Sequence, residues 1–144
     1  MRRIVLTILL LSSQWAHADL KKAMAEQNLE KRSGLALENA EAALKQARAA
    51  YDQGDNNEVA KDAAEVLDSV NLAASSLEQS GKNPRRSIWF KKAEISTRDL
   101  SRRIQDFQDE MSYVDRPLLD KLKVRVQEVH DELLMGVMEG RKKQ

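Results

Sequence analysis

Four stretches of this chain repeat an apolar side chain every three or four residues, over about residues 35–51, 58–80, 87–111 and 117–138. An α-helix completes a turn every 3.6 residues, so this spacing aligns the apolar side chains along one face of a helix. The sequence lacks the strict alternation of apolar and polar residues that marks a half-buried strand. The spacing therefore predicts an all-α protein with four helices, each of which buries one face.

The turns between the predicted helices are short and carry residues that end and begin helices. Gly54 and Gly81 each follow an apolar stretch, where glycine can stop a helix by adopting a left-handed conformation. Asp115 is placed to cap the fourth helix, and Pro84 and Pro117 suit the first turns of the third and fourth. Helices joined by short turns pack nearly antiparallel, at about 20°. We therefore predict an antiparallel helical bundle of about four helices, formed by two αα-hairpins, or alternatively an open pair of stacked hairpins.

The apolar stripes of the first two helices match in length and contain many alanines. Small side chains let helix axes approach closely, so we expect these two helices to pair tightly. The stripe side chains, helix by helix, are Leu37, Ala40, Leu44, Ala47 and Tyr51; Val59, Ala63, Val66, Val70, Ala73 and Leu77; Ala93, Thr97, Leu100, Ile104, Phe107 and Met111; and Leu119, Leu122, Val126, Val129, Leu133 and Val137. Five further apolar side chains lie off the stripes: Leu35, Leu72, Ile95, Leu118 and Leu134. We expect these five either to widen the buried faces or to mark a homodimer interface.

Residues 1–18 have the three parts of a secretory signal peptide. Arg2 and Arg3 form the positive start, residues 4–11 the apolar run, and residues 16–18 (Ala-His-Ala) the small-x-small cleavage site. The apolar run is much shorter than the roughly 20 residues that span a bilayer. We expect cleavage after residue 18 and export to a periplasm or out of the cell, with an uncleaved anchor as the alternative.

We expect the rest of the chain to form a single helical-bundle domain over residues 35–140. Residues 19–34 have few large apolar side chains and are expected to form a helical extension or arm, and residues 141–144 are a basic tail. The sequence after the leader contains no apolar stretch of the length that crosses a membrane. We therefore expect no stable membrane span in the mature chain.

Composition argues against several classes of function. Loss of the leader leaves 22 Lys and Arg against 23 Asp and Glu, a formal net charge of about −1. Nucleic-acid binders usually carry a strong basic excess, so we do not expect nucleic-acid binding. The chain has no cysteine, which rules out disulfide bonds and thiolate metal ligands.

His130 is the only histidine that remains after the leader. Di-metal sites in helical bundles use a Glu-x-x-His pattern, but Gln127 stands three residues before His130. No Gly-x-Ser-x-Gly turn marks an activated serine nucleophile. We expect His130 to be a surface or boundary residue, and the protein to have no catalytic residue, cofactor or metal.

The segment between the second and third predicted helices combines cations with the only tryptophan that follows the leader. The candidate partner-binding residues are Lys82, Arg85, Arg86, Trp89 and Lys92. Arginine forms paired hydrogen bonds with carboxylates and phosphates, and tryptophan is enriched in interfaces. These residues either bind an anionic lipid, a phosphate or an acidic partner, or leave solvated cations around a ring that covers the end of the core.

The run from Ala47 to Ala60, A-R-A-A-Y-D-Q-G-D-N-N-E-V-A, resembles the middle of a tetratricopeptide hairpin. That family places a tyrosine before a Gly-Asp turn and a small alanine on the following helix. The layout of the whole chain is similar to small exported all-helical bacterial proteins of uncharacterised function. This resemblance implies a bacterial source and a non-enzymatic role, and it identifies no catalytic or binding residues.

Three functions follow from these patterns as expectations. The first is an exported, non-enzymatic protein that binds a protein partner in the cell envelope. The second is a periplasmic chaperone-like or stress-response bundle, which would need a large exposed apolar surface. The third is a carrier of a small ligand or metal, which would need a cavity with converging polar groups and is the least supported.

Overall fold

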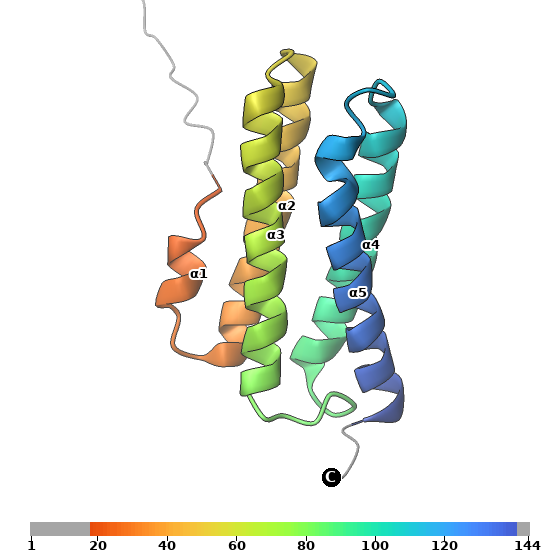
Figure 1. The fold of residues 1–144 in the computed structure, drawn as a ribbon. Coiled ribbons are helices and arrows are strands. Elements are labelled where there is room, and N and C mark those ends of the chain that lie inside the picture. Colours follow the sequence, from red (N-terminus) through yellow and green to blue (C-terminus); the bar gives the residue numbers. More distant parts are fainter. Residues whose placement is uncertain (1–17, 141–144) are drawn as a thin grey trace, which may run out of the picture.

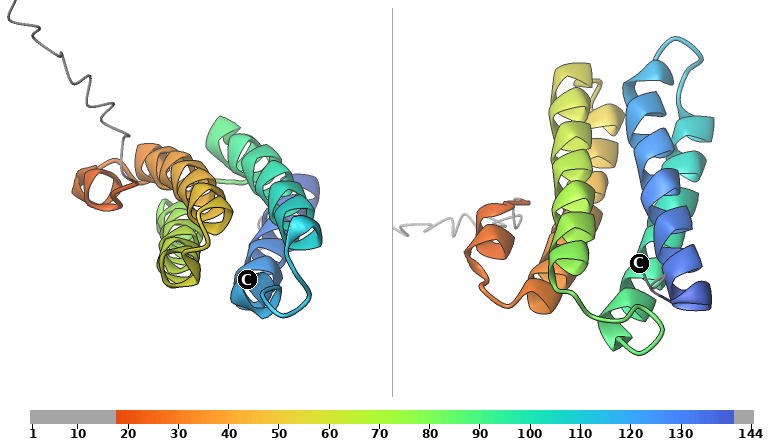
Figure 2. Two further views of the ribbon diagram at one scale, coloured as in Figure 1. Left: turned by 90° about the horizontal axis from the view of Figure 1, so that it is seen from above. Right: turned by 60° about the horizontal axis from the view of Figure 1, so that its bottom comes forward.

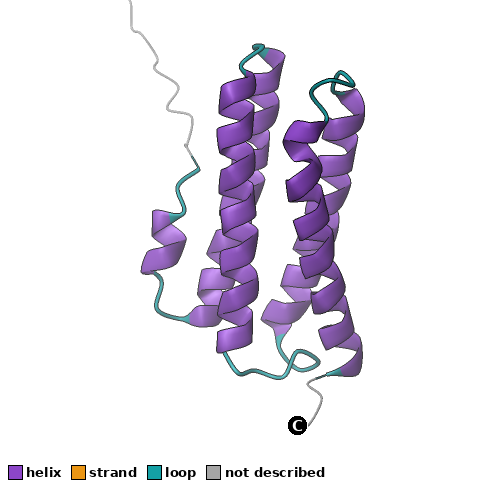
Figure 3. Ribbon diagram, viewed as in Figure 1, coloured by secondary structure: helices purple, strands orange, loops and turns teal. Residues whose placement is uncertain are grey.

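The computed structural model describes residues 18–140, and the regular secondary structure of that part of the chain is entirely helical (Figures 1 and 3). Its five helices are α1 (Lys21–Ala25), α2 (Leu29–Asp52), α3 (Asn56–Gln79), α4 (Ile88–Glu110) and α5 (Pro117–Glu139). The prediction of an all-α protein is confirmed. The predicted leader, apart from its last residue, and the basic tail at 141–144 lie outside the described residues.

The four long helices form two hairpins. α2 runs up and α3 returns beside it, and α4 and α5 repeat this pattern (Figure 1). Seen from above, α3 lies next to α5 and α2 next to α4, which leaves α3 and α4 diagonal to each other (Figure 2). The neighbouring helices of different hairpins therefore run parallel. The segment that joins α3 to α4 crosses one end of the molecule, the lower end in Figure 1.

The predicted stripe side chains form the core between the helices. All of them are buried except Tyr51 and Val137, which are partly buried. A second row of alanines on α2, at Ala36, Ala43 and Ala50, is also buried although it is not part of the stripe. This row is explained by the position of α2, which packs against α1, α3 and α4 and so is covered on several sides.

The five apolar side chains off the stripes divide into two groups. Leu35, Leu72 and Leu118 are partly buried and pack against the core, which they widen as expected. Ile95 and Leu134 are exposed on α4 and α5. Only these last two remain available for a contact with another molecule.

α2 begins at Leu29, earlier than the start near residue 35 that the sequence suggests. The Asn28 side chain caps it by accepting a hydrogen bond of 3.0 Å from the Lys31 amide. Gly34 does not interrupt the helix, and the ring of Trp89 occupies the space beside it. A Cβ on Gly34 would lie 2.8 Å from Trp89 Cζ3. The boundary between residues 34 and 35 therefore falls inside α2, and the arm is shorter than predicted.

Residues 18–28 form this shorter arm, and its helix α1 packs on α2. Ala23 is buried, and Leu20 packs against the core. The Leu20 amide donates a hydrogen bond of 3.0 Å to Glu65 Oε1 on α3. The same oxygen accepts a bond of 2.8 Å from Asn39 Nδ2 on α2, so one carboxylate connects the arm to both helices of the first hairpin.

Three of the helix-end signals in the sequence are confirmed, and Asp115 is an exception. Gly54 and Gly81 follow α2 and α3 with φ angles of 75° and 67°, and Pro117 is the first residue of α5. Asp115 is not the cap of α5. The residue before that helix is Arg116, which makes no side-chain capping bond, and the Asp115 carboxylate is directed to the first hairpin instead.

Candidate functional site

The predicted basic site begins in the loop between α3 and α4. The Asn83 carbonyl accepts hydrogen bonds of 3.0 Å from the amides of Arg86 and Ser87, so these residues form a turn. Pro84 lies in this turn and not in the first turn of the third long helix, which corrects the sequence-based prediction. α4 begins after Ser87, whose hydroxyl accepts a hydrogen bond of 3.2 Å from the Trp89 amide.

The loop packs on the C-terminal end of α5. Pro84 is buried against Gly136, where an added Cβ would lie 3.2 Å from Pro84 Cβ. The aliphatic part of Arg85 lies against Gly140, where an added Cβ would lie 2.9 Å from Arg85 Cδ. At both positions a side chain larger than that of glycine would crowd the loop. The two glycines therefore allow the loop to pack closely on the end of α5. The loop thus closes the lower end of the molecule.

Trp89 and Phe90 point in different directions. Phe90 is buried in the core, whereas Trp89 is partly buried against Gly34 at the contact between α4 and α2. Lys92 Nζ lies 5.1 Å from the centre of the Trp89 ring, within the range of a cation–π interaction. The ring that the sequence suggested for partner binding is therefore used for packing between helices, with one face covered by a lysine.

The structure does not gather the five predicted site residues into one pocket. Lys82 lines a groove between α1, α3 and α5, whereas Trp89 and Lys92 line a cavity of about 260 Å³ between α2 and α4. Arg85 and Arg86 are exposed on the connecting loop. The spacing of these five residues in the sequence cannot show that they are separated in space. The loop that carries them joins α3 to α4, and these two helices lie diagonally across the molecule from each other.

The groove lined by Lys82 has a volume of about 980 Å³. Its lining comes mainly from α3, from Leu20 and Met24 of the arm, and from α5. α1 and α5 lie on opposite sides of α3 in Figure 1. The apolar lining of the groove comes from Leu20, Met24, Leu72, Leu77, Pro84, Phe90, Val129 and Leu133. Its charged lining contains both signs and includes Asp68, Lys82, Arg125 and Glu132. An apolar floor with a mixed charged edge is the usual composition of a protein-binding surface.

Arg125 fixes one wall of this groove. Its Nε donates a hydrogen bond of 2.7 Å to Asn71 Oδ1 on α3, across the contact between the two hairpins. Its Nη1 lies 3.1 Å from Glu128 Oε2 and 3.8 Å from Glu132 Oε1. A guanidinium held by three partners has few other rotamers available. We therefore expect the α5 wall to be preformed.

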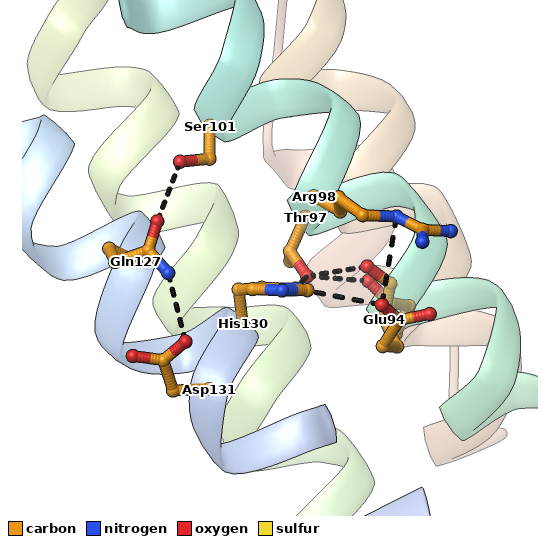
Figure 4. A network of polar contacts seen from close by, with 8 residues as sticks. Glu94, Thr97, Arg98, Ser101, Gln127, His130 and Asp131 are labelled. Atoms are coloured by element: carbon orange, nitrogen blue, oxygen red, sulfur yellow. Dashed lines mark hydrogen bonds and ion pairs between the residues drawn. The ribbon is translucent and has the colours of Figure 1, made fainter. Parts of the chain in front are cut away.

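His130 lies between α4 and α5 and is buried, with 9 % of its surface exposed, which corrects the expectation of a surface or boundary residue. Its Nδ1 is 3.5 Å from Thr97 Oγ1 and 3.9 Å from Glu94 Oε1 (Figure 4). The acidic residues around it in the sequence are on other faces of α5. Beside it, the Ser101 hydroxyl donates to Gln127 Oε1 at 3.0 Å. The contacts of His130 and Gln127 therefore connect α5 to α4.

At the upper end, Asp115 joins the two hairpins. Its carboxylate accepts hydrogen bonds from Ser112 Oγ at 2.7 Å, Asn56 Nδ2 at 2.9 Å and Tyr51 Oη at 3.2 Å. The Ser112 bond contributes most to lowering the pKa of Asp115 below its ordinary value of 3.8; partial burial opposes it, and the bonds from Tyr51 and Asn56 add to it. The Asp115 carboxylate that joins the two hairpins is therefore favoured in its ionised form.

Comparison of the chain with protein-family models, with curated proteins and with solved structures finds no match. Among residues 18–140, no helix is at once long enough and apolar enough to cross a membrane. Within the same residues, His, Asp and Glu side chains do not come together in any group of three or more that could hold a metal ion.

Proposed function

We propose that this protein is a non-enzymatic helical module that is exported and binds a segment of a protein partner in the cell envelope. The observation that carries the proposal is the groove between α1, α3 and α5. Its apolar lining includes Met24, which is 60 % exposed, and a partner segment would remove this side chain from water. The charged lining of both signs would orient that segment.

The chemistry of the groove favours binding over catalysis. Its lining contains neither imidazole nor thiol, and the Ser75 hydroxyl in it donates to the Leu72 carbonyl at 3.1 Å. A serine hydroxyl that donates to a backbone carbonyl, with no imidazole in the groove to act as its base, is a poor nucleophile. We therefore assign no reaction to this site.

Export is supported by the leader pattern and by where the helices begin. Residues 16–18 end the predicted leader, and α1 begins at Lys21, so cleavage would leave all five described helices intact. The arm formed by residues 18–28 supplies one wall of the groove. The processed chain would therefore retain the complete binding surface.

Site-directed photocrosslinking tests this proposal. A benzophenone amino acid at Ser75 places the reactive group in the groove, and the same probe at Lys45 places it on the exposed surface of α2. We expect one discrete crosslinked product in cells from the Ser75 probe only. The intact mass of the uncrosslinked chain from the same cells locates the cleavage site, which we expect after residue 18.

The control is Met24→Glu, which puts a charge into the groove at an exposed position. It should abolish the crosslink from Ser75 while leaving the helical circular dichroism spectrum unchanged. Equal products from both probes, or a Ser75 product that persists in the Met24→Glu variant, would contradict binding in this groove.

A further inference from the structure

At the lower end of the molecule, the loop between α3 and α4 and the first turn of α4 carry only positive charges. Between residues 82 and 92 the chain has five cations and no acid: Lys82, Arg85, Arg86, Lys91 and Lys92. All five side chains are exposed. This segment is therefore cationic, and the exposed acids Glu78 and Glu139 lie outside it, near the ends of α3 and α5.

Exposed apolar side chains stand next to these cations. Ile88, at the start of α4, is 60 % exposed, and Met135 and Met138, near the end of α5, are 55 % and 68 % exposed. The packing of Pro84 against Gly136 places the turn of α5 that carries the two methionines beside the basic loop. Exposed large apolar side chains beside a group of cations are the combination found in membrane-surface segments.

We propose that this lower end binds peripherally to the surface of a bilayer that contains anionic phospholipid. The cations are attracted by the negative potential of the lipid headgroups. The apolar side chains enter the boundary between headgroups and acyl chains, as they do in interfacial helices. Neither signal alone gives stable attachment, whereas a basic patch together with inserted apolar groups does.

The placement of the cations favours a lipid surface over an acidic peptide. Lys82 and Lys92 line separate cavities, and Arg85 and Arg86 lie on the loop between them, so no single groove collects the charges. A peptide would need such a groove, whereas the headgroups of a bilayer form an extended surface that can contact cations on a protruding loop without one. The groove proposed for a protein partner is a different surface, and the two proposals can fail independently.

Vesicle sedimentation tests the electrostatic part. The chain from residue 19 onward, which contains every described helix, is mixed with phosphatidylcholine vesicles or with vesicles in which about one third of the lipid is phosphatidylglycerol. We expect binding to the anionic vesicles only. The double variant Arg86→Glu with Lys91→Glu should bind them at least about tenfold more weakly, because two cations become anions.

The matched control is Lys45→Glu with Lys121→Glu, which changes the net charge equally. Lys45 and Lys121 are exposed and lie nearer the upper end, in the last part of α2 and the first part of α5. We expect this control to retain most of the binding. Equal loss in both double variants, equal binding to the two kinds of vesicle, or binding to neither would overturn the proposal.

A second pair of substitutions tests the apolar part. Ile88→Ser with Met138→Ser changes two exposed side chains, so the fold should be retained. We expect severalfold weaker binding to anionic vesicles, most clearly at high salt, where electrostatic attraction is screened. If this double variant bound anionic vesicles as strongly as the wild type at high salt, the proposal that these side chains insert into the bilayer would be wrong.

Discussion

At Gly34 the absence of a side chain has a packing function. Glycine inside a helix costs about 1 kcal/mol relative to alanine, yet here α2 passes through it without interruption. The space beside Gly34 is filled by the Trp89 ring, whose other neighbour is Lys92. A residue that looks like a helix breaker in the sequence is thus a point where a side chain of α4 packs directly against α2.

We expect Gly34→Ala to lower the free energy of unfolding. The new Cβ would lie 2.8 Å from a rigid ring, and overpacking of this kind costs about 1–3 kcal/mol, more than the roughly 1 kcal/mol gained in helix propensity. Urea unfolding followed by circular dichroism measures the change. In a Trp89→Ala background the same substitution should be neutral or stabilising by up to about 1 kcal/mol. A loss of equal size in both backgrounds would show that the ring is not the cause.

At the scale of elements, α1 is the part of the fold with the fewest tertiary supports. It spans only Lys21–Ala25, and a helix this short is not stable alone. Its position depends on Ala23, which is buried, and on the Leu20 amide bonded to Glu65. Because α1 forms one wall of the proposed groove, its attachment also determines whether that groove exists.

We expect Glu65→Ala to release α1 while the long helices remain folded. The Leu20 amide and the Asn39 side chain both lose their acceptor, at a cost of about 1 kcal/mol to global stability. Hydrogen exchange measured by mass spectrometry should show faster exchange in the peptide that covers α1, by at least about tenfold. Glu38→Ala, an exposed position on α2, is the control and should leave exchange unchanged. Unchanged protection of α1 in the Glu65 variant would mean that burial of Ala23 is sufficient.

At the scale of the whole molecule, the two hairpins are held together at both ends. The loop that carries Pro84 closes the lower end against Gly136. At the upper end Arg48 pairs with Glu110, and Asp115 collects hydrogen bonds from both hairpins. These contacts join residues that are far apart in the sequence. Their formation therefore requires that both hairpins are already folded.

We expect the contribution of Asp115 to stability to depend on pH. Its pKa is lowered in the folded protein, so the ionised carboxylate stabilises the fold above its ordinary value of 3.8. This stabilisation is lost as the pH falls from about 3.8 through the lowered folded value. Asp115→Asn should therefore be less stable than the wild type at pH 7 in urea unfolding, and the difference should shrink in acid.

Asp106→Asn, on the exposed face of α4, is the control for this pH dependence and should follow the wild type at all pH values. A difference between wild type and Asp115→Asn that stays constant down to low pH would show that the charge of Asp115 is not involved. A carboxyl NMR titration of the wild type gives the folded pKa of Asp115 directly.

The sequence by itself determined the four long helices and their buried faces, because the 3.6-residue repeat and the turn residues act over a few neighbouring positions. The sequence also holds the signal for the earlier start of α2, the capping Asn28, but it could not determine the role of Asp115 or the burial of His130. It also could not show that Lys82 and Trp89 belong to different surfaces, nor could it locate the groove between α1, α3 and α5. Only the tertiary structure decided these points. Each depends on which outer faces of the helices meet, and the crossing of the loop from α3 to the diagonal helix α4 sets that arrangement.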